Sequence, residues 1–116
     1  MTNPTKKEKA PESLKGTTFK TADLVTYQDG AVVSREIVRE KAGTVTVFAF
    51  DTGQQLSEHT APFDALVVGL DGAADISIAG QGHPVGAGEM IIMPAGVPHA
   101  LKAVSRFKML LVMVKK

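Results

Sequence analysis

Short hydrophobic or alternating stretches, separated by glycine-containing turns, make up most of this chain from residue 31 onward. Their lengths predict β-strands at 31–38, 44–50, 54–59, 65–70, 74–79, 90–93, 100–104 and 107–114. No window carries the i, i+3, i+4 pattern of an amphipathic helix, and glycines such as Gly30, Gly53 and Gly72 fall between the stretches. Regularly spaced strands with glycine-rich turns are typical of an all-β sandwich or barrel.

Two of the predicted strands are apolar on both faces. In 44–50, valine and alanine occupy one face while Phe48 and Phe50 occupy the other, and 107–114 is apolar throughout after Lys108. A strand of this kind packs inward on one face and against a further partner on the other. We therefore expect a homodimer, in which the contacting residues are Met109, Leu111 and Met113 or, with the opposite parity, Leu110, Val112 and Val114. The alternative is that the N-terminal leader or a loop covers the outer face.

The N-terminal residues differ from the rest in composition. Residues 1–16 lack hydrophobic periodicity, and five lysines against two glutamates give the first twenty residues a charge of +3, so the net charge of +1 leaves −2 for the remainder. This pattern predicts a disordered basic leader over 1–16, followed by a single domain over 17–116. The leader has no aromatic residue before Phe19 on which bases could stack, so we expect no nucleic-acid partner.

The remaining composition limits the chemistry and the location of the protein. The chain of 116 residues contains no cysteine, which excludes disulfides and thiolate catalysis. It has no apolar run of the roughly 20 residues that a membrane helix needs, and no stretch resembles a signal peptide. We therefore expect a cytoplasmic protein with no membrane partner.

Two histidines lie at the ends of predicted strands in similar glycine-containing contexts. His59 comes six residues after Gly53 in a stretch that runs on to Gly72, and His99 closes the pattern Gly88-x5-Pro94-x-Gly96-x2-His99. These spacings resemble the two signature motifs of the cupin superfamily, and in particular a small, single-domain, bacterial-type conserved-barrel cupin. The resemblance implies a small cupin barrel, also called a double-stranded β-helix or jelly roll.

The resemblance also implies a metal site, but the ligand set is incomplete. The family's first motif has a second histidine and a glutamate where this chain has Ala61 and Ala65, and its second motif usually closes with asparagine where this chain has Ala103. Iron, manganese, nickel or zinc is the metal expected in such a site. With His59 and His99 as the remaining ligands, we expect a divalent metal to be weakly bound or absent.

Three other residues are candidates for a further ligand. Asp64 lies one position before the expected carboxylate, so it reaches the cavity only if the chain loops or bulges after Ala61; otherwise it is a turn residue beside Pro62. Glu58 has the wrong strand parity and is predicted to point outward. His83, within a glycine-rich turn, is predicted to be a surface histidine.

Two functional hypotheses follow, and whether the protein is an enzyme stays open between them. The first is a binding module, in which a cavity near His59 and His99 holds a small polar organic ligand with or without a loosely held divalent metal. The second is a metal-dependent oxygenase or isomerase that uses the two histidines with a non-standard third ligand such as Asp64. The loss of ligands at Ala61 and Ala65 favours the first.

Overall fold

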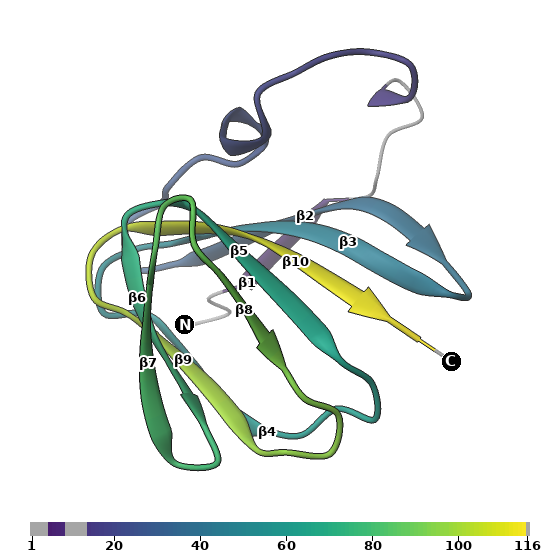
Figure 1. The fold of residues 1–116 in the computed structure, drawn as a ribbon. Coiled ribbons are helices and arrows are strands. Elements are labelled where there is room, and N and C mark those ends of the chain that lie inside the picture. The colour runs from purple at the N-terminus through teal and green to yellow at the C-terminus, as the bar shows by residue number, and fades with distance from the viewer. Residues whose placement is uncertain (1–4, 9–13, 116) are drawn as a thin grey trace.

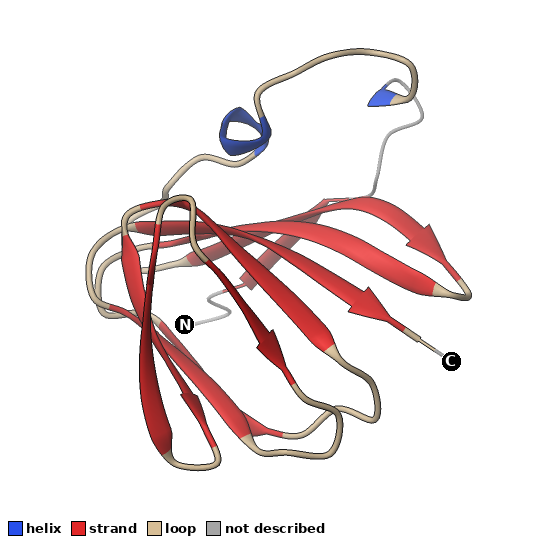
Figure 2. Ribbon diagram, in the orientation of Figure 1, coloured by secondary structure: helices blue, strands red, loops and turns tan. Residues whose placement is uncertain are grey.

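The protein is a two-sheet β structure, described here from a computed structural model that covers residues 5–8 and 14–115 (Figures 1 and 2). The all-β fold class predicted from the sequence is confirmed. No helix among these described residues is long and apolar enough to cross a membrane. The elements are β1 (Thr5–Glu8), the short 3-10 helix η2 (Thr21–Leu24), β2 (Val32–Glu40), β3 (Gly43–Phe50), β4 (Gln55–His59), β5 (Ala65–Asp71), β6 (Ala73–Ile78), β7 (Gln81–Gly86), β8 (Met90–Met93), β9 (His99–Ala103) and β10 (Phe107–Val114).

The strands form a six-stranded sheet in the order β1-β2-β3-β10-β5-β8 and a four-stranded sheet in the order β4-β9-β6-β7. All pairings are antiparallel except that of β1 with β2. The chain passes between the sheets at β3–β4, β4–β5, β5–β6, β7–β8, β8–β9 and β9–β10. The two sheets face each other, as Figure 1 shows, and the main core lies between them.

Part of the predicted leader is a strand. Thr5–Glu8 form β1, which runs parallel to β2 with Thr5 opposite Val32 and Glu8 opposite Arg35. These four residues fall inside the leader predicted to be disordered over 1–16, and they form an edge of the larger sheet. Residues 1–4 and 9–13 lie outside the described part of the chain, and the domain boundary at residue 16 stays a prediction.

The register of β10 decides between the two parities considered for its apolar residues. Met109 is 1% exposed and belongs to the core between the sheets, where Leu111 and Met113 also pack. Leu110 packs instead with a second cluster on the outer face of the six-stranded sheet. Leu110, Val112 and Val114 therefore form the outward face of β10, since successive side chains of a strand alternate between faces.

The segment that carries η2 covers one part of that outer face. Leu24, Val25 and Tyr27 belong to the outer cluster, and the Tyr27 hydroxyl donates a hydrogen bond to Asp71 Oδ2 at 2.5 Å. Burial, followed by that hydrogen bond, raises the pKa of Tyr27, so the phenol keeps its proton. Lys108 Nζ, which donates to the Ala22 carbonyl at 2.7 Å, also lies 5.0 Å from the centre of the Tyr27 ring. Over this part of the face the covering segment is a loop after the predicted leader, one of the two alternatives to a partner subunit.

The loops at the β5–β6 end of the barrel are held by one arginine. The Arg106 guanidinium contacts Asp29 at 2.6 Å and Asp51 at 3.0 Å. The Gly30 backbone N–H and then the Arg106 side chain hold the pKa of Asp51 below its ordinary value. This arrangement ties three loops together at the end of the barrel away from the β4–β5 and β8–β9 loops (Figure 1).

Candidate functional site

A β-bulge places the first histidine beside the second. On β4, Leu56 pairs with Leu101 and His59 pairs with His99, so three residues on β4 span the same distance as two on β9. The extra residue reverses the strand parity. Leu56 and His59 therefore both face the interior, although their spacing of three would put them on opposite faces of a regular strand.

The two imidazole rings meet through the same nitrogen atom. His59 Nε2 lies 3.2 Å from His99 Nε2, with the ring centres 4.4 Å apart and the ring planes at 72°. Each Nδ1 lies beside a backbone carbonyl oxygen, that of Ser57 at 2.8 Å for His59 and that of Val97 at 3.2 Å for His99. A carbonyl only accepts hydrogen bonds, so we assign the proton of each neutral ring to Nδ1. The two Nε2 atoms, 3.2 Å apart, then both carry lone pairs.

The two histidines differ in exposure. His99 is 5% exposed, whereas His59 is exposed at the rim. Burial, followed by the neighbouring charge of His59, lowers the pKa of His99, although the hydrogen bond to Val97 opposes this. His99 is therefore a neutral ring at neutral pH, and its Nε2 lone pair is available to an electron-pair acceptor.

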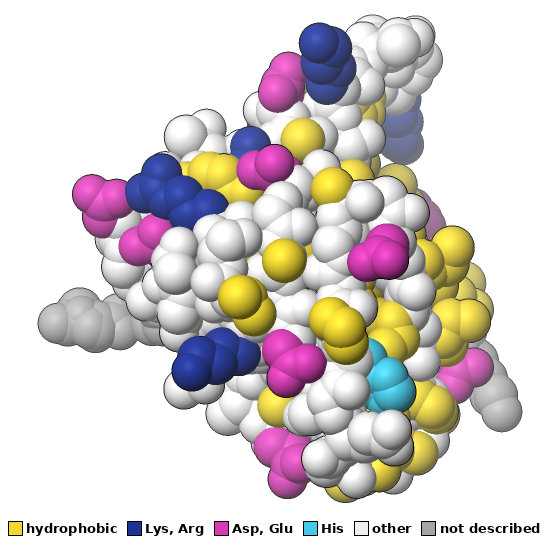
Figure 3. Space-filling view, turned by 60° about the vertical axis from the view of Figure 1, so that its left-hand side comes forward, with side chains coloured by type: hydrophobic (Ala, Val, Ile, Leu, Met, Phe, Trp, Pro, Cys, Tyr) yellow, Lys and Arg dark blue, Asp and Glu magenta, His cyan; other side chains and the backbone are white. Residues whose placement is uncertain are grey.

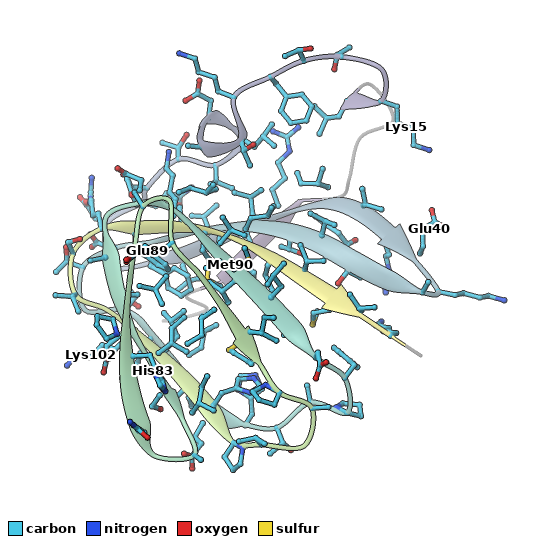
Figure 4. The ribbon with its side chains drawn as sticks, in the orientation of Figure 1. Lys15, Glu40, His83, Glu89, Met90 and Lys102 are labelled. Atoms are coloured by element: carbon cyan, nitrogen blue, oxygen red, sulfur yellow. The ribbon has the colours of Figure 1, made fainter. Side chains whose placement is uncertain are left out.

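The pair lines a small cavity between the sheets, where side chains fill most of the space (Figure 4). The cavity measures about 60 Å³. Apart from the two histidines its walls are apolar, and they are formed by Leu56, Ala61, Ala65, Val67, Met93, Ala100, Leu101, Met109, Leu111 and Met113. Within the described chain, no carboxylate lines this cavity. Ala61 and Ala65, where the resemblance placed two further ligands, both do.

Neither acidic residue considered from the sequence joins the pair. Asp64 Oδ1 accepts a hydrogen bond from the Ala95 backbone N–H at 2.8 Å, so the carboxylate caps the turn after β8. Glu58 lies on the outer face of the four-stranded sheet, in a shallow groove with Lys102 and Asp75. Among residues 5–8 and 14–115, no cluster of three or more histidine, aspartate or glutamate side chains is arranged to hold a metal ion.

His83 is not part of the cavity either. It lies on β7, at the opposite edge of the four-stranded sheet from β4, opposite the buried Ile76 (Figure 4). The side chain is half-buried rather than fully on the surface as predicted. Sequence reasoning placed it in a turn because Gly82 and Pro84 flank it, whereas pairing with β6 makes this segment a strand.

Charges of both signs are mixed on the face of the molecule in Figure 3. Lysine and arginine side chains are interspersed there with aspartate and glutamate rather than gathered into a patch of one sign. A nucleic-acid interface is typically a continuous basic surface.

Comparison with known proteins assigns the fold to a family. The family model for a cupin domain, Cupin_2, matches residues 46–115. A conserved protein of unknown function from Streptococcus pyogenes is 37% identical, with 94% of this chain and 96% of that chain covered and a TM-score of 0.86. A Cupin 2 conserved barrel domain protein from Leptotrichia buccalis is 40% identical with a TM-score of 0.81; the match covers 84% of this chain and 47% of that one, so this chain spans about half its length.

A more distant structure shows the same fold. A cupin superfamily protein from Desulfitobacterium hafniense is 24% identical, with 92% of this chain and 95% of that chain covered and a TM-score of 0.84. Among curated proteins, none matches this chain. The small cupin barrel predicted from the two histidine motifs is confirmed.

Proposed function

The chain belongs to the cupin family, and from this premise we propose that it is a binding protein that holds one metal ion between His59 and His99. The coordination positions that the two imidazoles leave free accept a small polar group from an organic ligand. The observation that carries the proposal is the convergence of the two Nε2 atoms, 3.2 Å apart, while both Nδ1 atoms face carbonyl oxygens.

The spacing of the two nitrogens fits a shared ion. Two imidazole nitrogens at about 2.0–2.1 Å from one tetrahedral zinc ion lie about 3.3 Å from each other. Histidines that bind metals typically donate their other ring N–H to a carbonyl or carboxylate, which fixes the ring orientation. The carbonyls of Ser57 and Val97 occupy that position here. The donor set and its supporting hydrogen bonds therefore fit a metal ion.

The size of the cavity limits what lies inside the barrel. Small-molecule sites usually measure about 300–1,000 Å³, and a cavity of about 150 Å³ holds benzene. The cavity beside His59 and His99 measures about 60 Å³. It suits an ion with one or two small polar atoms, so the larger part of an organic ligand would lie at the rim, where His59 is exposed.

A binding role is favoured over the alternative of a metal-dependent oxygenase or isomerase. Catalytic zinc sites generally have three protein ligands, with a further position open to water or substrate. The third ligand considered for this chain was Asp64, whose Oδ1 accepts the Ala95 N–H, away from the cavity. Two protein ligands support reversible metal binding, in which an exogenous group completes the coordination.

The first prediction tests the histidine pair. In calorimetric titration of the purified full-length chain with Zn²⁺, we expect one ion per chain, and His59→Ala should weaken binding by at least about tenfold because it removes one of two ligands. His59 is exposed, so the substitution leaves the core intact. His83→Ala is the matched control and should bind as the parent chain does. The proposal is wrong if the parent chain binds no metal, or if both variants lose affinity equally.

We also propose that two copies associate through the outer face of the six-stranded sheet. One cross-strand row on this face contains no charged residue: Ile92, Leu66, Val112, Val45 and Val38 are register neighbours across β8, β5, β10, β3 and β2. Ile92 is 58% and Val38 44% exposed. An uncharged apolar surface is compatible with the same surface on a second copy, which a two-fold interface requires.

The second prediction tests this dimer. Light scattering of the parent chain at micromolar concentration should give twice the mass of one chain, and Ile92→Arg should give the monomer mass because it introduces a charge into the apolar row. Val104→Arg is the control, since Val104 is 63% exposed but lies outside the row, in the loop between β9 and β10. A monomeric parent chain, or equal effects of both variants, would contradict the proposed interface.

A further inference from the structure

Two methionines flank the alanine that faces the histidine pair. In the six-stranded sheet, Ala65 pairs with Met93 of β8 on one side and with Met113 of β10 on the other. Residues directly opposite each other in neighbouring strands point to the same face. Met93, Ala65 and Met113 therefore form one inward-facing row, and all three line the cavity.

This row lies at the same end of the barrel as the histidines. His59 is the last residue of β4 and Ala65 the first of β5, while Met93 is the last residue of β8 and His99 the first of β9. The two connecting loops lie at one end of the barrel in Figure 1. Chain connectivity thus brings Met93 and Met113 of one sheet opposite the histidine pair of the other, across a cavity of about 60 Å³.

The donor side chains in this part of the cavity carry nitrogen and sulfur. Two imidazoles and two thioethers line it, and within residues 14–115 no carboxylate does. Thioether ligands select Cu(I), whereas iron, manganese and magnesium favour sites with carboxylate oxygens. Methionine has three rotatable side-chain bonds, so its sulfur adapts to the position of an ion without a change in the backbone.

We propose that the ion held by this site is Cu(I), bound by His59 Nε2, His99 Nε2 and the sulfur atoms of Met93 and Met113. The inference rests on the proposed function, since it needs an ion between the two histidines. With Cu(I) bound, the two thioethers occupy the coordination positions that a small exogenous ligand takes when a harder ion is bound. The apolar walls supply no oxygen side-chain ligand of the kind that would favour other metals.

The test compares Cu(I) with Zn²⁺ in the full-length chain and in three variants. Cu(I) affinity is measured without oxygen, with ascorbate as reductant and bicinchoninate as competing chelator, and Zn²⁺ affinity is measured by calorimetry. The double variant Met93→Leu/Met113→Leu keeps the side-chain volume but removes both sulfurs. Met109→Leu is the matched control, because Met109 lines the same cavity but pairs with Gly69, four residues farther along β5 from Ala65. His59→Ala removes a ligand for both ions.

We expect one Cu(I) per parent chain, and a loss of affinity of at least about tenfold in the double leucine variant, with Zn²⁺ affinity unchanged. Met109→Leu should bind Cu(I) as the parent chain does, and X-ray absorption of the Cu(I) protein should show sulfur as well as nitrogen neighbours. If the double variant does not fold, Met113→Leu alone replaces it, since Met113 is only partly buried.

The outcomes separate this inference from the function on which it rests. Unchanged Cu(I) affinity in the double leucine variant, or an equal loss in Met109→Leu, overturns the role of Met93 and Met113. Zn²⁺ binding without Cu(I) binding in the parent chain overturns the copper proposal but leaves the histidine site standing. Failure of the parent chain to bind either ion refutes both.

Discussion

The variant Ala61→His should bind Zn²⁺ about tenfold or more tightly than the parent chain. Ala61 lines the cavity two residues after His59 and is half-buried, so a larger side chain can turn toward the two Nε2 atoms. A third imidazole provides the three protein ligands typical of zinc sites that keep one open position. Calorimetric titration of both proteins measures the difference.

The control places the same residue one position away from the cavity. Thr60→His adds an imidazole beside His59, but Thr60 is exposed and does not line the cavity, so Zn²⁺ affinity should stay at the parent value. An equal gain in both variants would mean that any nearby histidine recruits zinc. Ala65→Glu is a poorer choice, because Ala65 is 3% exposed between two methionines and overpacking there would destabilise the fold by about 1–3 kcal/mol.

Gly72→Ala should lower the free energy of unfolding by about 2–5 kcal/mol. Gly72 has φ +74°, where a residue with a side chain is less stable by about 1–2 kcal/mol. A Cβ at this position would also lie 1.7 Å from the Arg106 carbonyl oxygen, so the backbone must move, which adds about 1–3 kcal/mol. For a chain of 116 residues each kcal/mol lowers Tm by about 4 °C, so thermal unfolding should show a drop of about 8 °C or more.

Substitutions at two further glycines separate the cost of the positive φ from the cost of the close approach to a carbonyl oxygen. Gly80 has φ +81° with no described atom within 4 Å of an added Cβ, so Gly80→Ala reports the conformational cost alone. In Gly69→Ala the added Cβ would lie 2.1 Å from the Gly86 carbonyl oxygen at an ordinary φ, so this variant reports the close approach alone. If Gly72→Ala is no more destabilising than Gly80→Ala, the approach of the β9–β10 loop to Gly72 does not constrain the fold.

Strands with strong local patterns could be predicted from the sequence. The predicted strands 90–93 and 107–114 coincide with β8 and β10, because each is a run of hydrophobic residues between turn residues. The segment 81–86 was not predicted as a strand, because two glycines and a proline in Gln-Gly-His-Pro-Val-Gly weaken its local preference. It becomes β7 by pairing with β6 over its whole length, and Val85 packs into the core.

The sequence by itself determined the fold class, the family resemblance and the two histidines, since alternation, glycine spacing and residue identity are all local properties of the chain. Tertiary structure alone decided that the bulge before His59 turns this histidine inward and that Asp64 caps a turn. It also placed Met93 and Met113 on either side of Ala65. These relations depend on the register between strands that lie far apart in sequence, and shifting a register by one residue would reverse every side chain of the strand.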